Sequence, residues 1–231
     1  MHRSPPPYAR SLRLAARGGL ALTLAAWFAL SACGSETEPE PEGPAVSTIV
    51  PPTSGGYVEA RTSQIVTDGS GPSQVFDDFT FDEDVTIRDV DWQGIYCVQT
   101  PGAAAPAPTA SSFTISIYPD QAGRPNLAAP AHTSTYSVAQ AGQTFEKNVS
   151  GLTCGTAANT TWPFSLYSAT LSSPFTAEAG TKYWLSIQAT TPSYAVYFGW
   201  RDGTVYNNLS LQLFDGTYTT YNIDRAYSLT P

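Results

Sequence analysis

Basic side chains, histidine and cysteine are scarce in this chain of 231 residues. It has 11 Lys+Arg against 19 Asp+Glu, two histidines and three cysteines. Nucleic-acid binding relies on clustered Lys and Arg that neutralise phosphates, and the sequence has no such cluster. A zinc centre needs several His or Cys ligands, which are missing here. The composition therefore argues against nucleic acid as a partner and against a zinc site.

The shortage of histidine also bears on catalysis. After the first 32 residues only His132 remains, in an Ala-Pro-Ala-His-Thr segment that we interpret as a solvated loop. A Ser-His-Asp enzyme needs a histidine that is held beside a nucleophile, and no Gly-x-Ser-x-Gly motif is present. The glycine motifs that cradle phosphates are absent as well. We therefore predict that the protein is not an enzyme.

Paired carboxylates are the one enzymatic alternative that the composition allows. A glycosidase needs two of them, which the fold can bring together from anywhere in the chain. Most aspartates in β proteins instead cap turns or lie on the solvated face, which makes this alternative the weaker one. The candidate aspartates are Asp77, Asp78, Asp89, Asp91 and Asp202.

The N-terminus has the pattern of an export signal. A leader with four arginines and no acidic residue precedes an apolar run from Leu20 to Leu30. That run has the length of a signal-peptide core and is well short of the roughly 20 residues of a membrane-spanning helix. Leu30-Ser31-Ala32-Cys33 then resembles the bacterial lipobox, in which the chain is cut before a cysteine that carries lipid.

The lipobox resemblance implies a signal peptide over residues 1–32 and a mature protein that is held on the membrane by lipid on Cys33. An ordinary secretory signal that happens to contain a cysteine is the alternative. Gly34 replaces the aspartate that retains lipoproteins in the inner membrane of enteric bacteria. The resemblance therefore favours the outer membrane as the location.

The segment after Cys33 is rich in Glu, Pro, Ser and Gly. Repelling charges and prolines cannot bury apolar surface, so we expect a stiff, disordered tether over residues 33–73. Removal of the leader removes four arginines, so 7 of the 11 Lys+Arg and all 19 Asp+Glu remain, a formal balance of −12.

Of the three cysteines, only Cys97 and Cys154 are left once Cys33 is assigned to the lipid. An even pair in an exported chain predicts a disulfide, and two buried free thiols are the alternative.

From residue 74 to residue 231 the periodicity is that of strands. Short segments alternate between apolar and polar residues and are separated by Gly, Pro, Asn and Asp, and none keeps a helical period for three turns. One example is Phe113-Thr114-Ile115-Ser116-Ile117-Tyr118. A phase slip after Arg88, with Gly94 downstream, predicts a bulge. About ten such strands predict an all-β fold, an antiparallel β-sandwich with the jelly roll as the leading arrangement.

Several of these segments also form a familiar series. It includes Asp77-Asp78-Phe79, Trp92-Gln93-Gly94, Gly123-Arg124-Pro125, Gly180-Thr181-Lys182-Tyr183-Trp184 and Phe198-Gly199-Trp200. The series resembles extracellular β-sandwich modules of anchored bacterial surface proteins and covers roughly Gln74 to Leu229. The resemblance implies a fold and an extracellular location but supplies no catalytic residues. The lipobox and the Cys97/Cys154 pair depart from it.

Two kinds of ligand site are compatible with this composition. Calcium takes carboxylate and backbone oxygens from irregular loops, so a structural calcium is a hypothesis. Its candidate ligands are Asp77, Asp78, Asp82 and Asp84. The second hypothesis is a carbohydrate site, because aromatic rings stack on sugars while polar neighbours fix their orientation. Its candidate residues are Tyr194, Tyr197, Trp200, Arg201, Asp202 and Tyr206.

For most aromatic residues a place in the core is the simpler interpretation, and Trp92 and Trp184 are its clearest cases. The sequence thus predicts a lipid-anchored cell-envelope protein with a non-catalytic binding β-sandwich, and carbohydrate is the leading ligand. Its partners would be the membrane, through Cys33, and a glycan or an envelope protein. A structural or adhesive surface protein without a small ligand is the alternative.

Overall fold

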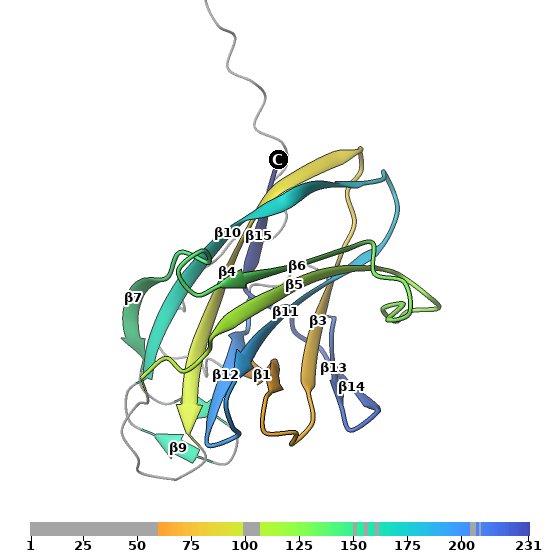
Figure 1. Ribbon diagram of the computed structural model, residues 1–231. Coiled ribbons are helices and arrows are strands. Elements are labelled where there is room, and N and C mark those ends of the chain that lie inside the picture. The colour runs from red at the N-terminus through yellow and green to blue at the C-terminus, as the bar shows by residue number, and fades with distance from the viewer. Residues whose placement is uncertain are drawn as a thin grey trace, which may run out of the picture. The chain divides into compact units, whose positions relative to one another are not determined.

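The structure is a computed structural model that describes residues 60–98, 107–149, 152–154, 157–159, 162–203, 207 and 209–231. Over these residues the chain forms fifteen strands and no helix. Two sheets pack face to face, and a short third pair is formed by β8 (Leu152–Cys154) and β9 (Ala157–Asn159). Figure 1 shows this arrangement. None of the described segments is a helix long and apolar enough to cross a membrane.

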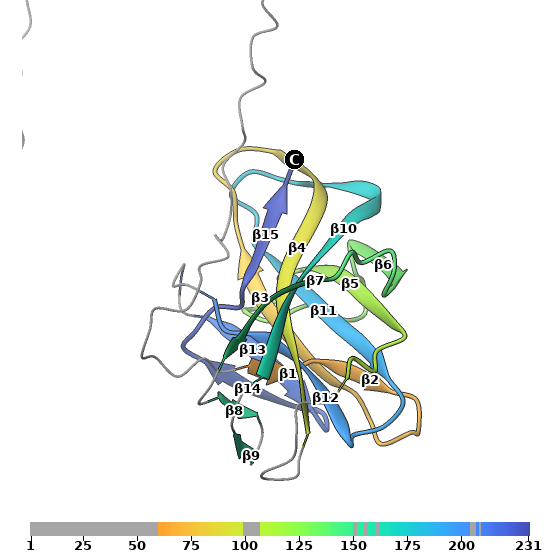
Figure 2. The same cartoon turned by 90° about the vertical axis from the view of Figure 1, so that its left-hand side faces the viewer.

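The first sheet has six strands in the order β1-β12-β4-β10-β7, and β15 pairs with β4 beside β12. Its strands are β1 (Ala60–Thr62), β4 (Val85–Val98), β7 (Thr144–Val149), β10 (Trp162–Ala177), β12 (Val196–Arg201) and β15 (Tyr227–Thr230). β4 is long enough that β12 pairs with its second half and β15 with its first half. Figure 2 shows β15 beside β4.

The second sheet has seven strands in the order β14-β13-β3-β2-β11-β5-β6. Its strands are β2 (Gln64–Val66), β3 (Ser73–Phe79), β5 (Ser112–Pro119), β6 (His132–Ser137), β11 (Tyr183–Thr191), β13 (Ser210–Phe214) and β14 (Thr217–Tyr221). All neighbours are antiparallel except β2 and β11, which run parallel.

Four antiparallel pairs are nested along the chain. β3 pairs with β13, β4 with β12, β5 with β11, and β7 with β10, so each pair encloses the next in sequence. Successive pairs alternate between the two sheets. This is the winding of a jelly roll, in which a long hairpin folds over into two packed sheets. The predicted β-sandwich is therefore confirmed.

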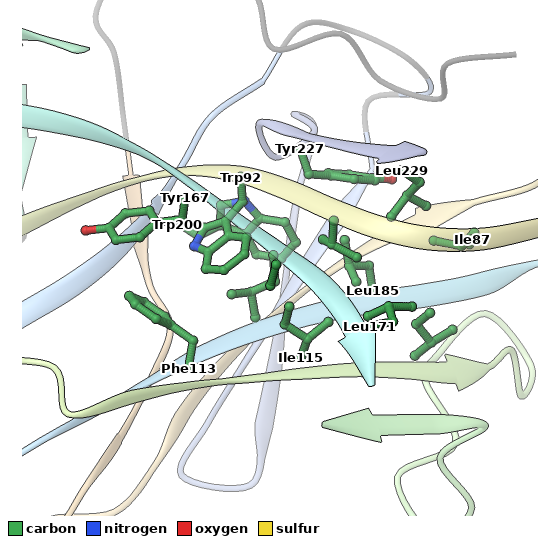
Figure 3. Packing of buried hydrophobic residues seen from close by; sticks show 14 of the residues in the cluster. Ile87, Trp92, Phe113, Ile115, Tyr167, Leu171, Leu185, Trp200, Tyr227 and Leu229 are labelled. Carbon is green, nitrogen blue, oxygen red and sulfur yellow. The ribbon is translucent and has the colours of Figure 1, made fainter. Parts of the chain in front are cut away.

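The core lies between the sheets and is built from alternate residues of the strands of both. Side chains on a strand point alternately to its two faces, so every second residue can be buried. Val75 and Phe79 of β3 and Ile115 and Ile117 of β5 meet Trp92 of β4 in one cluster of buried side chains. Figure 3 shows how aromatic and branched side chains from the two sheets meet there.

The predicted phase slip in β4 is present. Ile87 and Val90 are both fully buried although three positions separate them, and the register with β10 shifts opposite this point, between Thr170 and Phe175. Gly94 has a different role, because it pairs regularly with Ser165 and with Trp200. A Cβ atom at Gly94 would lie 2.4 Å from the Phe198 ring, so the glycine allows the close approach of that ring.

The domain boundary predicted at residue 74 is too late. β1 pairs with β12, and β2 pairs with β11, so residues assigned to the tether contribute strands to both sheets. The sequence signal was weak there because each of these strands has only three residues. Such short strands bring the count to fifteen instead of ten. The predicted signal peptide and most of the predicted tether lie outside the described residues.

Candidate functional site

A groove of about 540 Å³ opens at one end of the seven-stranded sheet, between the β2–β3 loop and the turn of the β13–β14 hairpin. Its described lining residues are Ser70, Gly71, Pro72, Gln74, Leu213, Phe214, Asp215 and Gly216. Sites for small ligands typically have about 300–1,000 Å³ and combine apolar walls with a few fixed polar groups. The size and composition of the groove fit that description.

One wall is the tip of the β13–β14 hairpin. Asp215 and Gly216 form a two-residue turn, and both have positive φ, 47° and 71°. Two such residues make the turn whose twist matches the flanking strands, which explains why Asp-Gly stands here. The turn holds Phe214 at the rim, where 54% of its surface is exposed. Phe214 thus presents an accessible apolar ring beside the groove.

The opposite wall is the β2–β3 loop, which side chains hold in place. The Oδ1 of Asp68 accepts a hydrogen bond from the backbone N–H of Ser70 at 2.9 Å. The hydroxyl of Tyr194 donates to the carbonyl oxygen of Gly71 at 2.6 Å, from the segment between β11 and β12. Tyr194, which was predicted as a ligand residue, therefore lies behind the groove wall and supports it.

Gln74 supplies a positioned amide in the groove lining. Its Nε2 donates to the hydroxyl of Tyr118 and to the Oγ of Ser186, both at 3.1 Å. In the strand register Gln74 lies opposite Leu213, which places the amide beside the hairpin wall. A side chain held by two hydrogen bonds presents its remaining polar atom in a defined direction, as a specificity-determining group requires.

The groove continues a largely aromatic face of the sheet, opposite to the core. Phe76, Tyr118, Trp184 and Leu211 form a second buried cluster there, and Tyr218 packs on Phe76 with a ring-centroid distance of 6.1 Å. A turn over residues 121–124 folds onto this face and is held by the hydrogen bonds between Gln121 and Arg124. The Arg124 guanidinium lies 5.0 Å from the centroid of the Tyr218 ring. Leu213 of the groove lining packs against this cluster, so the groove borders the aromatic face.

The predicted aromatic patch on β12 does not form, and Trp200 is the reason. Its side chain is fully buried in the core (Figure 3), where its Nε1 donates to the carbonyl oxygen of Ala226 at 3.0 Å. Tyr197 belongs to a different cluster, with Ile95 and Phe164, because neighbouring odd and even residues of a strand face opposite ways. The prediction that Trp200 binds a ligand at the surface is therefore wrong.

Arg201 and Asp202 belong to a buried polar network. Arg201 is 2% exposed, and its guanidinium donates to the Oε1 of Gln93. Asp202 forms an ion pair with Arg225, whose side chain is fully buried. Charged groups at this depth hold the fold together and cannot reach a ligand at the surface. Tyr206, the last residue of the predicted patch, lies outside the described residues.

The predicted calcium ligands lie apart. Asp77 and Asp78 are neighbours on β3 and so point to opposite faces of the sheet, and the Oδ2 of Asp78 lies 2.7 Å from the Nζ of Lys182. Asp84 accepts a hydrogen bond from the backbone N–H of Ala179 at 2.8 Å, and Asp82 is exposed. In the described part of the chain, no three His, Cys, Asp or Glu side chains are grouped to hold a metal ion.

The remaining glycosidase candidates, Asp89 and Asp91, accept hydrogen bonds from strand neighbours. Thr170 donates to Asp89 at 2.6 Å, and Ser228 donates to Asp91 at 3.1 Å. Both pairs join β4 to an adjacent strand. Neither aspartate is among the described lining residues of the groove, whose one carboxylate is Asp215. A pair of carboxylates that could flank a glycosidic bond is thus not found in that lining.

His132 differs from its predicted place in a solvated loop. It begins β6, is 8% exposed, and its Nε2 lies 3.1 Å from the Oγ of Ser134. Burial lowers its pKa, so the imidazole is neutral near pH 7. The sequence was misleading because Pro130 and Ala131 precede a strand that has only one apolar residue, Tyr136, on its buried face.

The cysteines are described only in part. Cys97 is fully buried in β4 and is disulfide-bonded. The side chain of Cys154 lies outside the described part, so its pairing with Cys97 stays a prediction. Cys33, the predicted lipidation site, also lies outside it.

Sequence reasoning missed the groove residues, above all Phe214 and Gln74. A signal was present, because Asp215-Gly216 between alternating segments is a strong indication of a hairpin, and such a turn exposes its flanking residues. For Gln74 the sequence contained no such signal, because its role depends on contacts with Tyr118 and Ser186, which are far away in the sequence.

Comparison with known proteins places the chain in a family. No curated protein and no solved structure matches it. Residues 50–220 match a family model described as a domain of unknown function, DUF7901. This match begins upstream of β1 and extends into β14, so it takes in the groove and every described strand except β15 and the last residue of β14. Because it covers well over half of the 231 residues, the chain belongs to the DUF7901 family.

Proposed function

We propose that this protein is a lipid-anchored component of the bacterial cell envelope whose β-sandwich binds extracellular polysaccharide, without catalysis, in the groove beside Phe214. The observation that carries the proposal is the exposed Phe214 ring, 54% accessible, at the rim of a groove with a positioned amide. Exposed aromatic rings stack on the C–H faces of sugars, and amides and hydroxyls bond to sugar hydroxyls.

The way in which the groove is built supports this use. Its two walls come from a hairpin turn and from a loop whose backbone is held by Asp68 and Tyr194. Binding to a pre-organised site avoids the entropic cost of ordering loops around the ligand. A rigid sandwich that carries the site on connecting loops is a common arrangement for recognition.

The predicted anchor gives the site a context. The lipobox resemblance at Cys33 and the acidic, proline-rich segment after it would hold the sandwich at a distance from a membrane. With few basic residues in the mature chain, attraction to anionic headgroups would be weak. An arrangement of this kind keeps a polysaccharide site accessible to polymers outside the membrane.

A glycan-array screen of the intact protein in detergent tests the proposal. We expect binding to one or more polysaccharides, a loss of at least tenfold in affinity for Phe214→Ala, and recovery for Phe214→Trp, which restores a ring. Leu127→Ala is the matched control, because Leu127 is a similarly exposed apolar residue, 41% accessible, outside the described groove lining. Equal loss in Phe214→Ala and Leu127→Ala would overturn the site. No binding on the array would favour a structural or adhesive role instead.

A further inference from the structure

We infer that the polysaccharide bound in the groove is uncharged, and that polymers carrying carboxylate, phosphate or sulfate groups are rejected. This inference rests on the proposed function and deepens it, because it names the class of ligand. It follows from the carboxylates of the groove lining and of the β2–β3 loop, and from the lack of Lys and Arg among the described lining residues.

One carboxylate lines the groove, and a second belongs to the loop that forms its other wall. Asp215 is exposed on the hairpin side and lines the groove directly. On the loop side, Asp68 stands two positions before the lining residue Ser70 and is held by it, since both the hydroxyl and the backbone N–H of Ser70 donate to its Oδ1. These hydrogen bonds lower the pKa of Asp68, so it stays ionised well into the acid range.

The groove lining supplies no compensating cation among its described residues. Its other polar groups are the amide of Gln74, the hydroxyl of Ser70 and backbone atoms, all of which suit neutral hydroxyl groups. Among the described residues, two cations contact aromatic rings of the same sheet face outside the groove lining: the Arg124 guanidinium stacks on Tyr218, and the Lys182 ammonium lies over Trp184 and pairs with Asp78. Anion sites in proteins use Arg, Lys or clustered backbone N–H groups, and the described lining has neither of those side chains.

The carboxylates of Asp215 and Asp68 both repel a charged repeat unit that enters the groove. At low ionic strength their fields reach across the groove, since the screening length is about 30 Å at 0.01 M salt and about 3 Å at 1 M. A single exposed charge pair changes the free energy by at most about 1 kcal/mol, which is roughly a fivefold change in affinity. A polymer brings many such charges, so rejection should be strong at low salt and weak at high salt.

The test uses matched polymers that differ in charge, and measures retardation of the intact protein in gels that contain them. The pairs are hydroxyethyl cellulose with carboxymethyl cellulose, galactan with polygalacturonate, and dextran with dextran sulfate. Gels are run at about 0.01 M and about 0.5 M salt, on either side of strong screening. We expect retardation by at least one neutral polymer and none by its charged counterpart at low salt.

Asp215→Asn is the diagnostic variant. Asparagine tolerates the positive φ of this position, and Asn-Gly is a preferred pair for such turns, so the groove wall is kept while its charge is removed. We expect the affinity for the charged polymer, relative to that for the neutral one, to rise about two- to fivefold in Asp215→Asn, at low salt only. Phe214→Ala should abolish retardation by the neutral polymer.

The outcomes separate the two claims. Retardation by charged polymers alone, lost in Phe214→Ala, would overturn this inference and leave the groove as a polysaccharide site. Equal retardation by both members of a pair, or no effect of Asp215→Asn on discrimination, would also overturn it. No retardation by any of the six polymers would overturn the proposed function and this inference with it.

Discussion

The Oδ2 of Asp77 accepts a hydrogen bond from the backbone N–H of Arg225 at 2.5 Å, although the two residues are 148 positions apart. Asp77 lies in the middle of β3, and Arg225 directly precedes Ala226 and β15, so this bond ties one sheet to the other. Asp77 is 1% exposed, and its Oδ1 has no hydrogen-bond partner among the residues that the structure describes. A buried carboxylate with one free oxygen is costly when it is ionised.

Burial therefore raises the pKa of Asp77 well above its ordinary value of 3.8, and the nearby Asp224 adds to the effect, while the hydrogen bond from Arg225 opposes it. Because the folded pKa lies above the unfolded one, the stabilising contribution of Asp77 is complete below about pH 3.8 and is lost as the pH rises through the raised folded pKa. We predict that Asp77→Asn, which keeps an accepting oxygen, removes this loss and stabilises the protein by about 1–3 kcal/mol at neutral pH.

Urea unfolding of both proteins between pH 4 and pH 8 measures this. The difference in free energy of unfolding between Asp77→Asn and wild type should grow as the pH rises. Asp82→Asn is the control, since Asp82 is exposed in the turn before β4 and its removal should leave the pH dependence of wild type unchanged. A constant difference between Asp77→Asn and wild type across this pH range would contradict the prediction.

The ion pair between Asp202 and Arg225 joins the chain segment that leads into the β13–β14 hairpin to the segment that leaves it. The backbone N–H of Gly203 donates to the carbonyl oxygen of Asp224 at 2.7 Å, and that of Ala226 donates to Arg201 at 2.8 Å, so the chain leaves and re-enters the first sheet at one place. We predict that Asp202→Ala costs about 3–5 kcal/mol, because it leaves the fully buried Arg225 without its ion-pair partner.

Thermal and urea denaturation of Asp202→Ala and Asp202→Asn test the role of charge in this pair. The asparagine variant keeps a hydrogen-bond acceptor for Arg225 and should lose distinctly less stability than the alanine variant. Equal losses would mean that the negative charge of Asp202 is not what stabilises Arg225.

Much of the fold could be predicted from alternation alone. Wherever a strand is half-buried, as with Ile115 and Ile117 of β5, the period of two marks it and gives the face that points inward. The short strands β1 and β2 could not be predicted, because three residues are too few to show a period. Their position depends instead on pairing with distant strands, such as that of Ala60 with Arg201.

The site was harder to predict, for a physical reason. Trp200, Arg201 and Asp202 have the composition of a ligand patch, but alternation sends Trp200 into the core, while burial and pairing take the two charged residues out of reach of a ligand. The groove depends on which loops meet, namely residues 70–72 and the Asp215-Gly216 turn. That meeting follows from the pairing of β3 with β13, which no local pattern encodes.

Gly94 carries a packing constraint that can be tested directly. A Cβ there would lie 2.4 Å from the Phe198 ring, which is itself packed against Phe113 with centroids 5.1 Å apart. The ring has no room to retreat, so we predict that Gly94→Ala costs about 1–3 kcal/mol through overpacking. The double variant with Phe198→Leu should be more stable than the sum of the single changes predicts. Additive losses in urea unfolding would show that the two residues do not interact.

The predicted lipid anchor should decide whether the protein is found in the membrane fraction or in the soluble fraction of the cell. If Cys33 carries the lipid, Cys33→Ser should move the protein from the membrane fraction to the soluble fraction, because acyl chains supply the membrane affinity. Metabolic labelling with a radioactive fatty acid should mark the wild type only. Ser35→Ala, two positions downstream, is the control and should stay labelled and membrane-bound. Labelling of Cys33→Ser would place the lipid elsewhere.

The disulfide of Cys97 calls for a partner, and the sequence predicts Cys154. A bond between them would close a loop of nearly sixty residues, which the chain-entropy model values at about 4 kcal/mol. Cys97→Ser and Cys154→Ser should therefore lose similar amounts of stability, and the double variant should lose little more than either, since one bond is removed in all three. Peptide mapping without reductant should show the two cysteines linked. Alkylation of Cys154 in the unreduced, unfolded protein would mean that Cys97 has another partner, and the shared loss of stability would then disappear as well.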